Sequence, residues 1–159
     1  MLTFLKRAML VLAFLCSATS IHAQGSDSSA VRCLAENISF EAPDESYTGK
    51  LAVATVTMNR VHAKAFPKTV CGVVYQRNTR GCQFSWTCTR RRTINPEIYQ
   101  LALRIAQEVL NKGRRLAMIQ NALYFHSTSV SPRWSRDKDI RRIAQIGAHI
   151  FYISVPTGT

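Results

Sequence analysis

Residues 33–42 have the sequence CLAENISFEA, and this stretch decides how the chain begins to fold. Apolar residues recur in and around it at the spacing of one helix face, and Pro43 then breaks the pattern. A helix is therefore expected over residues 30–42, with Glu41 in its last turn. The side chains expected to face the core are Val31, Leu34, Ala35 and Ile38.

Three more helices are predicted further along the chain. Residues 51–61 are apolar and β-branched, but their length and lack of turn signals favour a buried helix over a strand. A shorter helix is expected over residues 67–76. Asn95 as N-cap and Pro96 at the first helical position then open a helix that ends near Gly113. Its core stripe comprises Ile98, Leu101, Ala102, Ile105, Val109 and Leu110.

Extended segments are expected mainly in the last third of the chain. Residues 122–126, 143–146 and 149–153 are predicted strands, the last two joined around Gly147. Residues 81–88 form an irregular or β-like aromatic segment, and the basic loop at 90–92 after it is the expected substrate-lining loop. The predicted fold class is α+β, dominated by helices with a few short strands.

The N-terminus has the features of a secretion signal. Lys6 and Arg7 precede a short apolar run, and small and polar residues then lead to Ala23. The run is too short for a membrane-spanning helix of ~20 residues, which is the alternative. We expect residues 1–23 to be a signal peptide, 24–29 a disordered leader and 30–155 a single catalytic domain.

The charge of the chain favours an anionic partner. Without Lys6 and Arg7, 19 of the 21 Lys and Arg residues remain against 9 Asp and Glu, a net charge of +10. In an exported protein this points to a cell-wall polymer, lipopolysaccharide or acidic lipid, with solubility alone as the alternative. Nucleic acid is not expected, because no nucleic-acid-binding motif is present. The basic residues considered are Arg90, Arg91, Arg92, Arg114, Arg115, Arg141 and Arg142.

Four cysteines follow the signal: Cys33, Cys71, Cys82 and Cys88. An even number in an oxidising compartment predicts two disulfides, with three possible pairings, and reduced buried thiols are the alternative. Their spacing lacks the paired short gaps of a structural zinc site, and the histidines lie far apart in the sequence. No metal or other cofactor is expected.

Motifs along the chain resemble, in the same order, those of the cell wall hydrolases related to the SleB and CwlJ spore-cortex-lytic enzymes. The string at 33–42, with Glu45 beyond it, looks like the opening of that family, and QFSW at 83–86 is the most specific piece. The other matching strings are AVA at 52–54, NRV at 59–61, FPKTVC at 66–71, VVYQ at 73–76, ALYFH at 122–126, PRW at 132–134 and IGAHIFY at 146–152. The resemblance covers nearly all of the mature domain.

This resemblance implies a fold similar to the lysozyme and lytic transglycosylase group. It places Glu41 on the catalytic glutamate of the family and Glu45 on the loop at the entrance of the site. It also implies an enzyme that cleaves peptidoglycan between N-acetylmuramic acid and N-acetylglucosamine. With the secretion signal, we expect this enzyme to be secreted or periplasmic, and we expect a monomer. The chain departs from the family at Pro43-Asp44, where Arg-Gly is usual, so the loop after Glu41 is expected to follow a different path.

Glu41 also fits the requirement for a proton donor on chemical grounds. A carboxylic acid can donate a proton at neutral pH only where apolar surroundings raise its pKa. Glu41 follows Phe40 at the end of a buried helix, and Phe84 and Trp86 are expected to cover it. A helix-end carboxylate that makes only a local salt bridge is the alternative.

A second catalytic acid is harder to find in the sequence. Two-carboxylate hydrolases place their acids roughly 5 to 9.5 Å apart. Asp44 and Glu45 are expected on a loop, and Asp137 and Asp139 in a charged surface stretch. We therefore favour a lytic transglycosylase, as in known members of the related family, in which Glu41 acts as acid and then as base while the 6-hydroxyl of the substrate closes a 1,6-anhydro ring.

Several polar and aromatic residues are candidates for holding the sugar. Hydrogen bonds to sugar groups are expected from Gln83, Ser85 and Tyr124, and stacking on a sugar face from Trp86. His126 and Trp134 are further candidates, and internal packing is the alternative for all six. Structural roles are expected for Asn59, Arg60 and His149.

Three other functions remain open at this point. A muramidase would cut the same bond with water as the acceptor. A catalytically silent, cationic wall-binding protein would keep the fold after loss of activity through the Pro43-Asp44 change. A small disulfide-stabilised domain that binds nucleic acid or lipid by charge would show a steep salt dependence without cleavage.

Overall fold

The computed structural model describes residues 28–79, 81–89 and 93–155. The predicted signal peptide, most of the predicted leader and the basic loop at 90–92 lie outside these ranges. Among the helices of the described part, none is both long and apolar enough to cross a membrane.

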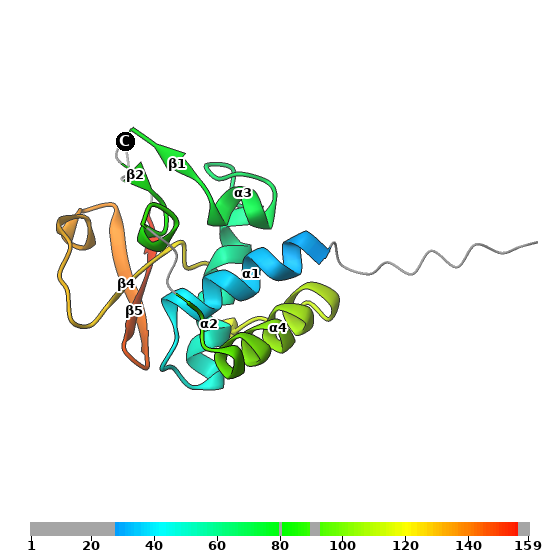
Figure 1. Cartoon of the computed structure of the whole chain (residues 1–159). Coiled ribbons are helices and arrows are strands. Elements are labelled where there is room, and N and C mark those ends of the chain that lie inside the picture. Colours follow the sequence, from blue (N-terminus) through cyan, green and yellow to red (C-terminus); the bar gives the residue numbers. More distant parts are fainter. Residues whose placement is uncertain (1–27, 80, 90–92, 156–159) are drawn as a thin grey trace, which may run out of the picture.

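In the described part of the chain, four α-helices form one side of the molecule (Figure 1). They are α1 (Ser28–Glu41), α2 (Tyr47–His62), α3 (Val70–Val74) and α4 (Pro96–Asn111). Helix α2 is buried along most of its length, because α1, α3 and α4 pack around one side of it and the C-terminal sheet against another. The buried helix predicted over 51–61 is confirmed, and it begins four residues earlier than expected.

Polar side chains fix where the helices begin. Ser46 accepts a hydrogen bond from the Gly49 N–H at the start of α2, and Asn95 accepts from the N–H groups of Glu97 and Ile98, as predicted for α4. Thr69 caps α3 in the same way, so this helix is shorter than the predicted 67–76. At the other end of α1, the helix stops at Glu41, two residues before Pro43.

A three-stranded antiparallel sheet forms the other side of the molecule (Figure 1). Its strands are β3 (Tyr124–Ser127), β4 (Ile140–Ile146) and β5 (His149–Ser154), in the order β3-β5-β4. All three predicted strands are present, and β4 begins three residues earlier than expected. A second core cluster joins the sheet to α2 through Ala52, Val56, Ile119, Ala122 and Phe151.

Short elements connect the two sides. A small hairpin of β1 (Arg77–Asn78) and β2 (Gly81–Cys82) leads into the 3-10 helix η1 (Ser85–Thr87), which matches the irregular aromatic segment predicted at 81–88. Two further 3-10 helices, η2 (Ala117–Ile119) and η3 (Arg133–Arg136), flank β3 in the chain. The α+β, helix-dominated fold class is confirmed.

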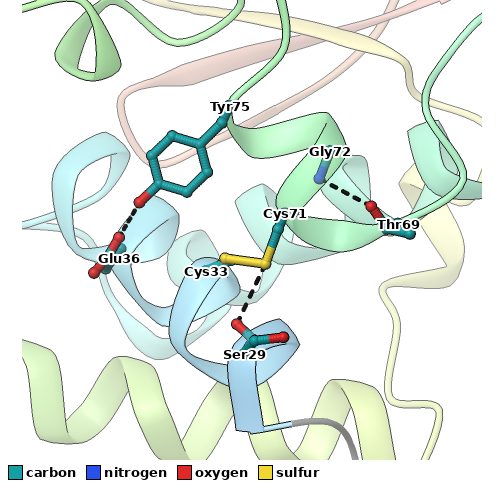
Figure 2. Close-up of a disulfide and its surroundings, with 7 residues drawn as sticks. All are labelled: Ser29, Cys33, Glu36, Thr69, Cys71, Gly72 and Tyr75. Atoms are coloured by element: carbon teal, nitrogen blue, oxygen red, sulfur yellow. Dashed lines mark hydrogen bonds between the residues drawn. A yellow bond between two sulfur atoms is a disulfide. The ribbon is translucent and has the colours of Figure 1, made fainter.

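Two disulfides are present, as predicted, and the structure resolves their pairing. Cys33 of α1 is bonded to Cys71 of α3, and Cys82 to Cys88 around η1. Figure 2 shows the first bond, beside which the Tyr75 hydroxyl donates a hydrogen bond to the Glu36 carboxylate. Helix α3 and the Tyr75 that follows it are therefore tied to α1, the helix that carries Glu41, by the disulfide and by the hydrogen bond to Glu36.

Candidate active site

Two cavities meet at Glu41. The first has a volume of about 450 Å³ and is lined by Glu41, Arg60, Gln83, Phe84, Tyr124, Phe125, Trp134, Asp137, Asp139 and Ile140. The second has a similar volume, about 450 Å³, and is lined by Glu41, Ala42, Pro43, Asp44, Glu45, Ser127, Ala148 and His149. Glu41 is common to both, so a chain-like ligand that fills both cavities has to pass its carboxyl group.

The position of Glu41 follows from the way α1 ends. The helix stops at this residue, and the preceding Phe40 is held by stacking on the Trp86 ring, with the ring centroids 4.4 Å apart. Burial raises the pKa of Glu41 from 4.5 to about 7, and the charge of Arg60 acts against this rise. The residue is thus able to hold a proton near neutral pH, as the sequence predicted for an acid in apolar surroundings.

Arg60 forms part of the wall of the first cavity and is only 3% exposed. Its Nε donates to the Leu123 carbonyl at 2.8 Å, and its guanidinium lies over the rings of Phe66 and Phe84, 5.5 and 5.2 Å from their centroids. The bond to Leu123 fits the structural role predicted for Arg60. Its place beside Glu41 was not predicted, because it depends on how α2 packs against α1.

The contacts that the structure describes for the Asn59 side chain are structural. Its amide donates to the carbonyls of Ile119 and Ala122, at 3.0 and 2.9 Å. These bonds join α2 to the segment before β3, as expected from the sequence, and Asn59 does not line either Glu41 cavity.

Three of the six predicted sugar-binding residues lie in the first cavity with Glu41: Gln83, Tyr124 and Trp134. The rings of Tyr124 and Trp134 are neighbours, 5.8 Å apart. His126 contacts Trp134 from outside the cavity lining, with ring centroids 5.6 Å apart, and its Nε2 is 2.8 Å from the Tyr152 hydroxyl. His126 therefore supports a cavity-lining ring.

Ser85 and Trp86 do not line either of the cavities that contain Glu41. Trp86 is 9% exposed in the hydrophobic core, where its indole N–H donates to Asn37 at 3.3 Å. Of the two residues expected to cover Glu41, Phe84 lines the first cavity, whereas Trp86 packs against Phe40 instead.

Asp137 and Asp139 line the first cavity, which corrects the expectation that they only belong to a charged surface stretch. Both are exposed, as expected, but their segment runs from η3 into β4 along the cavity wall. The sequence feature that pointed to a place in the cavity was the nearness of both residues to Trp134. This feature does not show whether the segment faces the cavity or the solvent.

The loop after Glu41 is fastened to the β4–β5 turn. The Glu45 carboxylate accepts a hydrogen bond from the Ala148 N–H at 2.7 Å. It also lies 3.4 Å from Nδ1 of His149, without forming a hydrogen bond there. Burial lowers the pKa of His149 against the influence of Glu45, so the histidine is neutral at pH 7 and the contact is not an ion pair. Glu45 thus joins the loop after Glu41 to the β4–β5 turn at the wall of the second cavity.

Gly147→Ala is expected to break the hydrogen bond between the Ala148 N–H and the Glu45 carboxylate. A Cβ at Gly147 would lie 1.9 Å from the Glu45 Oε2, and the backbone there has a φ of 55°. Gly113→Ala is the matched control, because φ is 66° but a Cβ would meet nothing within 4 Å. In urea, the free energy of unfolding should fall by roughly 1–2 kcal/mol in the control and by about 1 kcal/mol more in Gly147→Ala. Equal losses would mean that Glu45 does not hold the turn.

Comparison with known proteins identifies the family. The family model described as Cell Wall Hydrolase matches residues 44–152. The spore cortex-lytic enzyme of Bacillus subtilis is 31% identical over 125 residues, which is 76% of this chain and 36% of that protein. The spore cortex-lytic enzyme of Oceanobacillus iheyensis is 28% identical over 131 residues, which is 80% of this chain and 43% of that protein. The chain thus spans about two fifths of these relatives.

Solved structures agree with this assignment. The catalytic domain of the Bacillus cereus SleB protein matches with a TM-score of 0.57 and 27% identity, over 80% of this chain and 92% of that one. The catalytic domain of the germination-specific lytic transglycosylase SleB from Bacillus anthracis matches with a TM-score of 0.60 and 27% identity, over 80% and 97%. The resemblance noted in the sequence is confirmed, and the chain belongs to the cell wall hydrolase family.

Proposed function

We propose that this protein cleaves peptidoglycan at the bond between N-acetylmuramic acid and N-acetylglucosamine, as a lytic transglycosylase with Glu41 as acid and base. The observation that carries the proposal is the position of Glu41 where two cavities meet, with its pKa raised to about 7. A glycan strand needs a proton donor with room for a sugar on each side of the bond that breaks. The relatives described as cortex-lytic enzymes and as a lytic transglycosylase support it.

The reaction needs one carboxyl group. Protonated Glu41 gives its proton to the glycosidic oxygen while the bond from C1 of the muramic acid to that oxygen breaks. The bonding electrons stay on the leaving oxygen, which becomes a hydroxyl. The 6-hydroxyl oxygen of the same muramic acid bonds to C1, and its proton returns to Glu41. No water is consumed, and Glu41 ends the cycle in its starting form.

The first cavity supplies groups suited to a sugar. In our proposal Gln83 and Tyr124 hydrogen-bond its hydroxyl or acetamido groups, and Trp134 packs on a sugar face, with His126 behind its ring. Ser85 and Trp86 lie outside both cavities and have no part in this arrangement.

A muramidase is the second candidate, and Asp137 and Asp139 favour it. Both line the cavity that contains Glu41, so a second carboxylate is present to activate water or to act as a nucleophile. The products of the two reactions differ by one water molecule, although the bond cleaved is the same.

The basic residues around the first cavity suit a substrate with negative charges. Exposed cations alternate with cavity-lining residues along η3 and the start of β4: Arg133, Arg136, Lys138, Arg141 and Arg142. Of the basic residues considered from the sequence, Arg141 and Arg142 belong to this set. Arg114 instead pairs with Glu108, and Arg115 donates to the carbonyls of Val109 and Arg114. We propose that the η3–β4 cations attract the carboxylates of peptide stems or other anionic envelope polymers. The two disulfides fit a place outside the cytoplasm.

The rate should fall on the alkaline side of pH 7. Glu41 donates only in its protonated form, and burial raises the pKa of this group to about 7, so the donor is lost as the pH rises through that value. We expect kcat/KM to fall roughly tenfold for each pH unit above 7. The profile is measured on soluble glycan fragments, with circular dichroism at each pH as the control for folding. A fall centred near pH 4.5 would contradict a buried donor.

Digestion of purified peptidoglycan tests the proposed function. We expect the protein to release soluble fragments whose new chain ends are muramic acid residues, as identified by mass spectrometry. Release of peptides with intact glycan strands would instead indicate an amidase or peptidase. If it binds walls from several sources without releasing any fragment, the protein is a wall-binding module, despite keeping Glu41.

A further inference from the structure

Arg60 is placed in a way that its structural bond to Leu123 does not explain. Arg60 is 3% exposed, and its guanidinium lies over the rings of Phe66 and Phe84, where a charge loses most of its contact with water. Among the described residues, the Nη1 atom is buried and has no hydrogen-bond partner. A helix-joining side chain does not need a charge, as the neighbouring Asn59 shows with its two carbonyl bonds.

The groups around Glu41 offer one clear source of compensating charge. From the other elements, the titratable or charged side chains that share a cavity with it are Asp44, Glu45, Arg60, Tyr124, Asp137, Asp139 and His149. Of these, Arg60 is the one whose charge shifts the pKa of Glu41. The coupling is reciprocal: burial lowers the pKa of Arg60 to about 10, and Glu41 is the leading influence that keeps it from falling further.

We propose that Arg60 is a positioning residue whose buried guanidinium is the counter-charge for the carboxylate that Glu41 becomes after protonating the glycosidic oxygen. This rests on the proposed function, in which Glu41 is neutral before bond cleavage and negative until the 6-hydroxyl proton returns. The two states of Glu41 therefore differ in how strongly Arg60 stabilises them. A cation held rigidly by Leu123, Phe66 and Phe84 stabilises the charged state without having to reorganise.

The same arrangement sets the working pH of the enzyme. Burial alone would raise the pKa of Glu41 further, and the charge of Arg60 limits that rise. A donor whose pKa lies near the working pH combines a high protonated fraction with easy proton loss. Arg60 thus acts on the reaction through Glu41.

The test compares the alkaline side of the pH profile in three variants of the full chain. Arg60→Met removes the charge and should move the fall in kcat/KM to higher pH by about 1 pH unit, with a roughly tenfold lower maximal rate. Arg60→Lys keeps a positive charge and should stay close to the original profile. Asn59→Ala is the structural control, which should lower the melting temperature and leave the midpoint of the fall unchanged.

A titration of Glu41 itself provides a second measurement. In protein labelled with carbon-13 at glutamate side chains, the Glu41 resonance is assigned from its loss in Glu41→Gln. Its midpoint should rise in Arg60→Met, even if that variant is too slow for a rate profile. Arg60→Gln serves in place of Arg60→Met if the latter does not fold.

Two outcomes separate failure of this inference from failure of the proposed function. If Arg60→Met or Arg60→Gln loses stability but keeps the midpoints of both the rate profile and the Glu41 titration, Arg60 is only structural. The role of Glu41 in cleavage is then unaffected. If the unmodified protein cleaves no peptidoglycan, the proposed function fails. An unchanged Glu41 titration in Arg60→Met would then overturn the charge coupling as well.

Discussion

Glu41→Gln is expected to lower the rate of peptidoglycan cleavage by about a thousandfold or more. Glutamine keeps the size and shape of the side chain at the junction of the two cavities, but it has no proton to give and cannot take one back. General acid–base catalysis contributes about 10²–10⁴-fold per group, and here one group serves both steps. The measurement is the initial rate of fragment release at pH 6, where Glu41 is mostly protonated.

Glu36→Gln is the matched control on the same helix. The Glu36 carboxylate accepts a hydrogen bond from Tyr75 beside the Cys33–Cys71 disulfide, and it does not line either cavity (Figure 2). Loss of the Glu36 carboxylate should lower the free energy of unfolding slightly, without the thousandfold fall in cleavage rate expected for Glu41→Gln. If Glu41→Gln retained more than a tenth of the activity, another residue would have to supply the proton.

The stability of Glu41→Gln should also differ from that of the original protein in a pH-dependent way. The pKa of Glu41 is about 7 in the folded chain and 4.5 in the reference state, so its protonation favours folding below pH 4.5, and this contribution disappears as the pH rises through 7. Glutamine never ionises. The variant should therefore be more stable than the original above pH 7, by roughly 1–3 kcal/mol.

Loss of the Cys33–Cys71 disulfide is expected to have the largest effect on stability. The bond joins cysteines 38 positions apart and ties α1 to α3. Closing a loop of that length stabilises the folded state by about 4 kcal/mol in the chain-entropy description. The double change Cys33→Ser with Cys71→Ser should lower the free energy of unfolding by that amount, as measured in urea.

The second disulfide provides the comparison. Cys82 and Cys88 are only 6 positions apart, so their replacement by serine should cost about 2 kcal/mol. Because α1 carries Glu41, the first pair of changes should also lower activity at temperatures well below unfolding. A larger loss from the short loop would show that contacts around η1, and not loop closure, dominate the effect.

The helices that could be predicted best from the sequence are those marked by residues within or next to the helix itself. Asn95 and Pro96 mark the start of α4, the apolar and β-branched run of α2 without turn signals indicates a buried helix, and Pro43 marks the end of α1. Glu41 could be chosen because its family position and its apolar neighbours agree. Each of these signals lies within a few residues of the element that it predicts.

Features that depend on distant contacts were not predictable in the same way. Four cysteines allow three pairings, and only the packing of α3 on α1 selects the observed one. The place of Arg60 beside Glu41 depends on how α2 packs against α1. Asp137 and Asp139 belong to a segment rich in charge, and its orientation toward the cavity is set by the pairing of β4 with β5. Trp86 was expected near the sugar and is instead a core residue.

The incorporation of heavy oxygen tests the central claim most directly. Peptidoglycan is digested in water enriched in the heavy oxygen isotope, and the new muramic acid ends are examined by mass spectrometry. If Glu41 alone drives ring closure by the 6-hydroxyl, these ends carry an anhydro ring and no heavy oxygen. New reducing ends that each carry one heavy oxygen would contradict the transglycosylase reaction and show that water is the acceptor.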